Sequence, residues 1–298
     1  MLGQHLPPSP RDAPAAFDYE AAFSRNIGWV TEAEQSALRG KRVAIAGLGG
    51  VGGAHALTLA RLGIGRFAIA DFDCFDIVNF NRQAGATVET LGRPKVDVLA
   101  ERVRAINPQA EVRTFDEGVT AGNVDDFLAG IDSYVDGLDV FAFAAREMTF
   151  AACDRLRIPA VTAAPIGMGA ALLSFLPGRM TFEQYFRVAG HTEPEKAVRF
   201  LVGLTPAMLH RGYLVDRSQV DFAAHRGPST VMACQMCAGI AATETLKILL
   251  GRGPVLAAPW GLHFDAYTHR LKRTWRPGGN ANPLQRLLIS LARRAYRA

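Results

Sequence analysis

A glycine-rich turn between two apolar runs constrains the fold of this chain more than any other feature. The stretch KRVAIAGLGGVGGAHALTLARLGIGRFAIADFD, residues 41–73, has the pattern of a strand, a turn, a helix and a second strand with an acidic end. Gly47, Gly49 and Gly52 satisfy the spacing G-x-G-x-x-G, and Gly50 lies between them. Glycines let the backbone turn tightly and let a phosphate approach the free N–H groups of a helix N-terminus. The stretch therefore predicts a nucleotide site in a βαβ unit.

Strand-like and helix-like segments alternate along the first half of the chain. Strands are predicted at 42–46, 66–71, 111–115, 133–136 and 159–163, and helices at 50–62, 92–106, 124–129 and 145–157. This alternation favours an α/β fold of the Rossmann-like, doubly wound class with a mostly parallel sheet. Further strands at 169–176, 260–264 and 268–275, with a small-residue helix at 229–250, predict added antiparallel strands on the C-terminal side.

The chain divides into three predicted parts. Residues 1–40 form an N-terminal arm with short helices, 41–277 form one α/β domain, and 278–298 form a basic amphipathic tail. Within the domain, the irregular segment 178–228 is the predicted substrate-binding cap. No apolar run reaches the roughly 18 residues that a membrane span needs, and the N-terminus has no apolar signal region, so a cytoplasmic protein is expected.

Positive charge is concentrated at the C-terminus. The chain has a net charge of +5, but eight basic residues and no acidic ones follow position 268, so residues 1–268 carry a net charge of −3. This acidic body makes nucleic-acid binding an unfavoured prediction. In the tail, Leu284, Leu287, Leu288 and Leu291 fall on one face of a predicted helix. That face is expected to be covered by the protein itself or its dimer mate, by an acidic partner protein, or by an anionic membrane.

Charged and amide side chains follow several of the predicted strands. Asp71 and Asp73 end the second strand, DIVNFNRQ places Asn79 and Arg82 just beyond it, and Lys95 opens the next helix. Asp139 follows the fourth strand in YVDGLD. The carboxyl ends of parallel strands meet at one edge of the sheet, so these groups are expected to converge on the glycine turn. A carboxylate at the end of the second strand suits a ribose. Hydride transfer needs no such cations, whereas chemistry at a triphosphate does.

These motifs together resemble the ThiF/MoeB/HesA family of adenylating domains, which are related to ubiquitin-activating enzymes. The resemblance rests on GLGGVGG, DFD, NFNRQ, GRPK, INP and VDGLD, and it runs from about residue 25 to 275. It implies ATP- and Mg²⁺-dependent adenylation of a carboxylate, typically the C-terminus of a ubiquitin-like protein or a peptide.

The resemblance also implies a role for individual residues. The glycines 47, 49, 50 and 52 and the carboxylates Asp71 and Asp73 would form the nucleotide site, with Asp71 on the ribose. Asn79 and Arg82 would contact the phosphates, Lys95 would stabilise the leaving pyrophosphate, and Asp139 would hold Mg²⁺. Arg25, in FSRNIG, would reach the triphosphate from the partner subunit of a homodimer.

Two departures from the family pattern modify these expectations. Many members bind a structural zinc with two C-x-x-C pairs, but here Gly279 and Asn282 stand where one pair would be, so zinc is not expected. Cys234 and Cys237 form a C-x-x-C inside a predicted helix without a second pair. Members that form a thioester use a cysteine of the crossover region, and this chain has none between Cys153 and Cys234. Adenylation with direct transfer to a separate acceptor is therefore the expected route.

Other functions stay open at this stage. The chain is alternatively a non-catalytic partner subunit of an activating enzyme, or an NAD(P)- or flavin-dependent oxidoreductase. A dehydratase that acts on a modified tRNA base through an acyl-adenylate is a relative of the adenylating class. The sequence does not identify the carboxylate or the final nucleophile.

Overall fold

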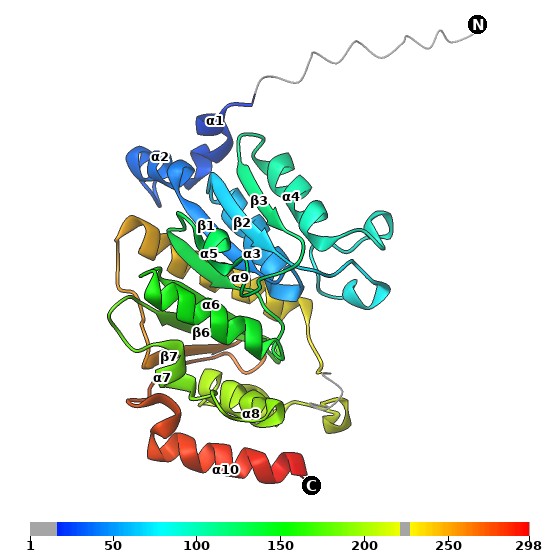
Figure 1. The fold of residues 1–298 in the computed structure, drawn as a ribbon, viewed down its shortest axis with the longest axis vertical. Helices are drawn as coiled ribbons and strands as arrows, with labels where there is room; N and C mark the ends of the chain where they lie inside the picture. The colour runs from blue at the N-terminus through cyan, green and yellow to red at the C-terminus, as the bar shows by residue number, and fades with distance from the viewer. Residues whose placement is uncertain (1–16, 221–226, 298) are drawn as a thin grey trace, which may run out of the picture.

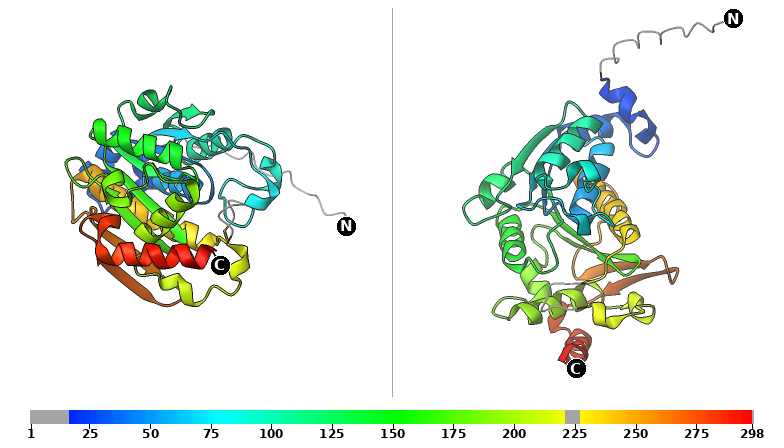
Figure 2. Two further views of the ribbon diagram at one scale, coloured as in Figure 1. Left: turned by 60° about the horizontal axis from the view of Figure 1, so that its bottom comes forward. Right: turned by 90° about the vertical axis from the view of Figure 1, so that its right-hand side faces the viewer.

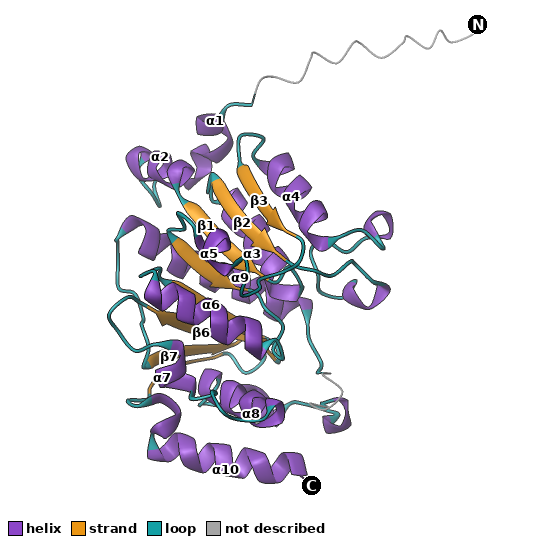
Figure 3. Cartoon of the chain, viewed as in Figure 1, coloured by secondary structure: helices purple, strands orange, loops and turns teal. Residues whose placement is uncertain are grey.

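The computed structural model describes residues 17–220 and 227–297. The predicted arm up to residue 16 and positions 221–226 of the predicted cap lie outside the described residues. The described part of the chain forms one mixed α/β sheet with helices packed against both of its faces (Figure 1, Figure 3).

Eight strands form the sheet in the order β3-β2-β1-β4-β5-β6-β7-β8. They are β1 (Arg42–Ala46), β2 (Arg66–Ala70), β3 (Glu111–Phe115), β4 (Ser133–Asp136), β5 (Ala160–Ile166), β6 (Gly169–Phe175), β7 (Trp260–Asp265) and β8 (Arg270–Trp275). The pairs among β1 to β5 are parallel, and β6, β7 and β8 are added antiparallel. The predicted fold class is confirmed. The strand order reverses between β1 and β4, which is where open α/β sheets bind ligands.

Two hydrophobic layers hold helices on the sheet. On one face, α3 (Gly50–Arg61), α4 (Lys95–Ile106) and α9 (Val231–Leu250) pack on the apolar side chains of the central strands. On the other face lie α5 (Val124–Leu128), α6 (Phe143–Arg155), α7 (Phe182–Phe186) and α8 (Glu193–Leu204). Helix α9 has the length and apolarity of a membrane span, but half of it is buried against α3, β5 and β6, so we interpret it as a core helix.

The N-terminal helices cap the amino end of the strands. They are α1 (Tyr19–Phe23), the short 3₁₀ helix η1 (Ser24–Asn26) and α2 (Glu32–Gly40). The Tyr19 hydroxyl donates to the carbonyl of Gly63, at 2.6 Å, in the loop that precedes β2. This segment therefore lies at the sheet edge opposite to the glycine turn, which follows the carboxyl end of β1.

The C-terminal segment crosses the antiparallel end of the molecule. After β8 come η6 (Gly279–Ala281) and the long helix α10 (Pro283–Arg297), which runs beside α8 at the end of the molecule far from α1 (Figure 2). A Cβ atom at Gly279 would lie 2.2 Å from the Tyr185 carbonyl oxygen. The buried Asn280 amide donates to the carbonyls of Phe186 and Arg199, at 2.7 and 3.0 Å. The two positions where the resemblance implies a zinc-binding pair in many members are thus occupied by Gly279, packed against Tyr185, and by Asn282, whose amide donates to the Pro277 carbonyl at 3.3 Å.

Three local expectations differ from the structure. Helix α4 begins at Lys95 rather than at residue 92, because Gly92 adopts a positive φ of 75° and Pro94 is the N-cap. Strand β8 begins at Arg270, after a turn that includes His269 with a φ of 53°. Helix α10 packs on its own domain, but Leu284, Leu287 and Leu291 stay exposed while other side chains face the core.

Candidate functional site

The backbone of the glycine turn is packed so closely that only residues without a side chain fit at several of its positions. Gly47 has a φ of 80°, and a Cβ there would lie 2.4 Å from the carbonyl oxygen of Gly137, which follows β4. A Cβ at Gly52 would lie 1.7 Å from the carbonyl oxygen of Gly47. Gly49 differs, since its Cβ would meet only the Gln83 side chain, at 3.6 Å. The turn is therefore fixed by Gly47, Gly52 and Gly137, and the N-terminus of α3 begins directly after Gly49.

Asp71 ties the glycine turn to the end of β2. Its carboxylate accepts from the backbone N–H of Leu48 at 2.6 Å and from that of Asp73 at 2.8 Å. Burial raises the pKa of this carboxyl, and the nearby Lys95 and the two N–H donors partly offset the effect. Asp71 thus lies at the position predicted for a ribose-binding carboxylate while it also holds the turn.

The segment that follows β2 brings an arginine to the N-terminus of α3. The Asn79 Oδ1 atom accepts from the Asp76 N–H at 3.0 Å, which closes the turn η2 (Ile77–Asn79). The Arg82 guanidinium donates to the Val78 carbonyl and to the Asn81 side chain, at 3.1 and 2.8 Å. A Cβ at Gly50 would lie 3.5 Å from the Arg82 Cγ atom, so the arginine stem lies against the first turn of α3.

Lys95 is a buried cation at the same edge. Its ammonium lies 2.8 Å from a carboxylate oxygen of Asp73, and only 6% of its side chain is exposed, against 53% for Asp73. The backbone supports the pair, because the Lys95 N–H donates to the Asp73 carbonyl at 2.9 Å. Removing an ammonium group from water is costly unless an anion pairs with it. Asp73 supplies that partner in this structure.

The loop after β4 contains one buried and one exposed carboxylate. Asp136 accepts from Arg146 Nε at 2.9 Å, from Thr162 at 2.9 Å and from the Leu138 N–H at 3.2 Å. Arg146, on α6, is almost fully buried and also donates to the Leu138 carbonyl at 2.7 Å. Asp139, at the top of this loop, is exposed. One of its oxygens accepts from the Phe141 N–H at 3.0 Å, and the other has no hydrogen-bond partner among the described residues.

The parallel strands place most of the predicted residues at one edge. Gly47, Asp71 and Asp139 follow the neighbouring strands β1, β2 and β4, Arg82 lies against Gly50, and Lys95 pairs with Asp73. Arg25 is not part of this group within one chain. It is exposed in η1, at the opposite edge of the sheet.

Several site residues were not predicted from the sequence. Gly137 contacts the glycine turn, and Arg146 secures the Asp139 loop. The Cys234 Sγ atom lies 3.0 Å from the position of a Cβ at Gly50, so this cysteine of α9 packs against the first turn of α3. Gly137 lies within the VDGLD motif, which was noted for its carboxylates alone. Gln83, which the NRQ motif placed just beyond the second strand, has a buried Oε1 atom without a partner among the described residues.

Metal-ligating groups are dispersed in the structure. Within residues 17–220 and 227–297, no three His, Cys, Asp or Glu side chains gather as a metal site would require. Cys153, Cys234 and Cys237 are buried, and Cys74 is exposed. Burial also raises the pKa of Cys153 and of Cys237 far above the usual thiol range.

A glycine turn at the switch point of a doubly wound sheet, with cations and carboxylates around it, defines a nucleotide-binding α/β protein. The ThiF family model matches residues 23–286. The chain therefore belongs to the ThiF family, and the resemblance seen in the sequence is confirmed.

Similar proteins with different names lie within this family. The chain is 30% identical over 214 residues to the heterocyst protein HesA of Trichormus variabilis, covering 65% of this chain and 79% of HesA. It is 38% identical over 126 residues to the tRNA threonylcarbamoyladenosine dehydratase of Escherichia coli, covering 42% and 46%. It is 34% identical over 143 residues to the sulfur carrier protein ThiS adenylyltransferase of Escherichia coli, covering 48% and 56%. The chain thus spans about half the length of the latter two relatives.

The fold also resembles solved structures. A crystal structure of Escherichia coli MccB with MccA-N7isoASN matches with a TM-score of 0.66 and 17% identity, covering 91% of this chain and 75% of that chain. A crystal structure of PaaA matches with a TM-score of 0.62 and 19% identity, covering 81% and 66%. At these identities the likeness establishes the shared fold.

Proposed function

We propose that the protein activates a carboxylate with ATP. A carboxylate oxygen attacks the α-phosphorus, the bond from that phosphorus to the bridging oxygen breaks, and pyrophosphate leaves as acyl-adenylate forms. The observation that carries this proposal is the position of Arg82, Lys95 and Asp139 around one glycine turn at the strand-order switch point. A redox nucleotide needs no such arrangement of charges, whereas a triphosphate does.

Each residue has a physical role in this reaction. The N–H groups at the start of α3 face the phosphates. The Asp71 carboxylate, which accepts from two backbone N–H groups, has further lone pairs that accept from a ribose hydroxyl. Arg82 and Asn79 lie beside that helix end, where a cation and an amide donor bind phosphate oxygens. Lys95 exchanges its contact with Asp73 for the departing pyrophosphate, whose negative charge increases as the bond breaks.

Asp139 fits the requirements of a Mg²⁺ ligand. Mg²⁺ in nucleotide sites takes one or two carboxylates besides phosphate oxygens and waters, and Asp139 offers an exposed oxygen at the correct edge. The ion would neutralise phosphate charge when bound. Arg146 and Asp136 hold the loop that carries this carboxylate.

A polypeptide is the substrate that the surface supports best. Mostly apolar side chains of β7 and β8 share one face of the sheet, because they pair across the two strands. The pairs are Trp260 with Trp275, Leu262 with Arg273, and Phe264 with Leu271. Leu271 and Trp275 are more than half exposed, which is typical of a docking surface rather than of a small-molecule pocket. We therefore propose the C-terminal carboxylate of a peptide or ubiquitin-like protein as substrate. Among the relatives, the Escherichia coli adenylyltransferase is named for a protein substrate, the sulfur carrier protein ThiS.

Transfer and assembly are further parts of the proposal. The cysteines of α6 and α9 are buried, so the adenylate passes to a separate acceptor rather than to a thioester cysteine of the crossover segment. We place the enzyme in the cytoplasm as a homodimer in which Arg25 acts across the interface. Mixing inactive Arg25→Ala and Asp139→Ala proteins would then restore activity, and continued inactivity despite subunit exchange would argue against action in trans.

ATP–pyrophosphate exchange tests the proposed reaction. The substrates are synthetic peptides with free C-terminal carboxylates, and their amidated copies are the controls. We expect exchange with free acids only, lost by more than 100-fold in Asp139→Ala but retained in Asp125→Ala, an exposed carboxylate paired with Arg155 elsewhere. Exchange that survives in Asp139→Ala would contradict the proposed role of Asp139 as a Mg²⁺ ligand. Exchange with amidated peptides would contradict the proposal that a carboxylate is the group activated.

A second candidate rests on the tRNA dehydratase relative. An acyl-adenylate that forms within a modified tRNA base would use the same nucleotide site. Incubation with tRNA that carries the carboxylated base, followed by nucleoside mass spectrometry, separates the two candidates because only the dehydratase lowers the nucleoside mass by one water.

A further inference from the structure

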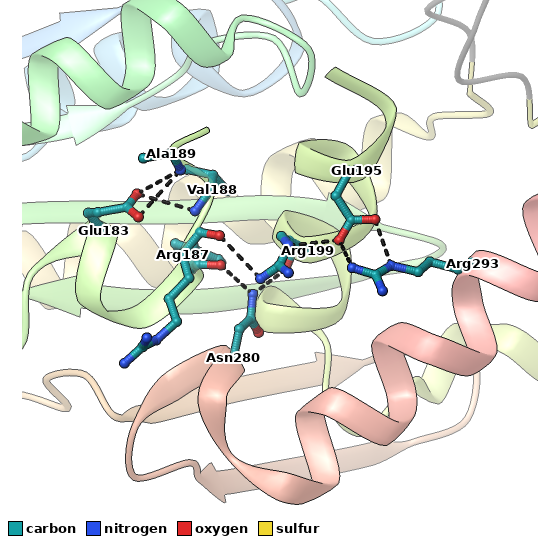
Figure 4. Close-up of polar contacts among 9 residues, drawn as sticks. Glu183, Arg187, Val188, Ala189, Glu195, Arg199, Asn280 and Arg293 are labelled. Atoms are coloured by element: carbon teal, nitrogen blue, oxygen red, sulfur yellow. Dashed lines mark hydrogen bonds and ion pairs between the residues drawn. The ribbon is translucent and has the colours of Figure 1, made fainter. Parts of the chain in front are cut away.

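Helix α10 is only partly covered by the rest of the domain. Gln285, Ile289 and Ala292 are buried against α8, where Ile289 and Ala292 pack on Val198 and Val202. The Gln285 amide donates to the Val202 carbonyl at 3.1 Å. Figure 4 shows the polar part of this contact, in which the Arg293 guanidinium donates to both oxygens of the Glu195 carboxylate. The Nε–Oε2 distance is 2.7 Å. These contacts fix the orientation of the helix.

A row of leucines remains uncovered on another side of the same helix. Leu284, Leu287 and Leu291 are 59, 57 and 50% exposed. Their spacing of three and four positions lines them up along one face, here called the leucine ridge. Because other side chains dock the helix, the leucine ridge contributes little to holding α10 in place. An apolar ridge of this kind in an otherwise well-packed protein marks an interaction surface.

A basic hollow adjoins the leucine ridge. It has a volume of about 490 Å³, and its lining includes His191, Thr192, Ser290, Arg293 and Arg294. Its one carboxylate, Glu195, is already bound by Arg293 and Arg199. Arg294 lies seven positions after Leu287, so it borders the ridge, and it makes no ion pair within the described part of the chain. The hollow therefore presents unbalanced positive charge.

Ion pairs link α6, the helix that follows the Asp139 loop, to the basic hollow. The loop that carries Asp139 leads directly into α6, and Glu147 in the second turn of α6 binds Lys196 at 2.6 Å. Lys196 follows Glu195, whose partner is Arg293 of α10. Two ion pairs thus connect the start of α6 to the hollow.

Charge and shape together select one kind of occupant. The segment after residue 268 contains no acidic residue, so α10 of a second copy offers no charge that complements Arg294 and Arg286. A bilayer is flat and would leave the hollow unfilled, whereas side chains of a polypeptide can enter it. We propose that the leucine ridge and the basic hollow together bind an acidic amphipathic segment of a partner polypeptide. Its apolar side chains pack on the ridge, and its carboxylates enter the hollow.

A displayed library of random 16-residue peptides tests this proposal. Binders are selected on the full-length protein and counter-selected on Leu287→Ser and Arg294→Glu variants. We expect acidic peptides with apolar residues three or four positions apart, whose affinity falls at least tenfold with either variant. Leu156→Ser and Arg61→Glu, exposed residues on other surfaces, should leave the affinity unchanged. Replacing the acidic residues of a selected peptide with lysine should restore binding to Arg294→Glu.

The other occupants are measured in the same variants. Cosedimentation with phosphatidylglycerol vesicles that depends on Leu287 would overturn the proposal in favour of a membrane. A dimer in sedimentation velocity that Leu287→Ser dissociates would overturn it in favour of a second copy. Selection of peptides without acidic residues, or no selection at all, would also overturn it. Matching thermal melts of all variants exclude unfolding as the cause.

Discussion

Asp136 and Asp139 show how neighbouring carboxylates in one motif acquire different roles. Asp136 is the last residue of β4 and lies in the core. Arg146 and Thr162 donate to its Oδ2 atom, and the Tyr134 hydroxyl and the Leu138 N–H donate to its Oδ1 atom. Asp139 lies three residues further along an exposed loop, with one oxygen free of partners in the described residues. A buried carboxylate that accepts four hydrogen bonds has little capacity for a ligand, so the loop position decides which of the two is available to a metal.

The first prediction concerns this buried pair. Arg146→Met removes the cation and leaves the Asp136 carboxylate buried and unpaired, so we expect the free energy of unfolding to fall by about 3–5 kcal/mol. The matched change Arg155→Met breaks an exposed ion pair with Asp125 and should cost less than about 1 kcal/mol. Urea unfolding followed by circular dichroism measures both. Equal losses in the two variants would show that burial does not determine the strength of the Asp136 pair.

The sequence predicted those site residues whose position follows from strand ends. Asp71, Asp73 and Asp139 were found because parallel strands bring their carboxyl ends together, and Gly47 and Gly52 because a tight turn excludes side chains. Arg146 was missed because its contact with Asp136 depends on how α6 packs over β4. Cys234 was missed for the same reason, since the contact between α9 and Gly50 is a tertiary one.

Among the elements, α10 departs most clearly from expectation. Its four leucines have the helical spacing of a buried face, yet three of them, Leu284, Leu287 and Leu291, are at least half exposed. The buried side is formed by Gln285, Ile289 and Ala292, and Leu288 packs against it. The leucine periodicity is real, but the helix has a second, shorter apolar stripe that fits the surface of α8. Sequence periodicity alone cannot rank two stripes, because the shape of the facing element decides between them. By contrast, every strand of the sheet was predicted with ends within three residues of the observed ones, the largest difference being the end of β5 at Ile166.

The second prediction separates the two stripes of α10. Ile289→Ala should lower the free energy of unfolding by about 2–4 kcal/mol, because it opens a cavity against Val198 and Val202. Leu287→Ala should change it by less than about 0.5 kcal/mol, since that side chain is 57% exposed. Chemical denaturation of both variants in one buffer gives the comparison. If Leu287→Ala proves the more damaging of the two, the helix is docked through its leucines.

At the scale of the whole molecule, two buried histidines link stability to pH. His55 in α3 and His263 in β7 are almost completely buried, and neither ring nitrogen of either residue has a hydrogen-bond partner among the described residues. Burial lowers the pKa of each to about 4, and for His263 the nearby His210 contributes to that lowering. Both side chains are therefore neutral in the folded protein near neutral pH.

The third prediction follows from these pKa values. In the unfolded chain a histidine takes up a proton below about pH 6.5, whereas in the folded protein it does so only below about pH 4. Stability should therefore fall as the pH drops from 6.5 to 4, by up to about 3 kcal/mol for each histidine. The variants His55→Gln and His263→Gln should each flatten the profile in this window. An unchanged slope in the double variant would assign the pH dependence to other groups.

The central claim is that the glycine turn binds ATP for an adenylation reaction, and calorimetric titration with nucleotides tests it most directly. We predict that ATP with Mg²⁺ binds, that NAD⁺ and NADP⁺ do not, and that Lys95→Ala weakens ATP binding at least tenfold. Gly49→Ala should also weaken it without a loss of thermal stability, because a Cβ there meets only the Gln83 side chain and lies in the turn where we propose that the phosphates bind. Binding of NAD⁺ or NADP⁺ in place of ATP, or ATP affinity that neither variant changes, would contradict the account.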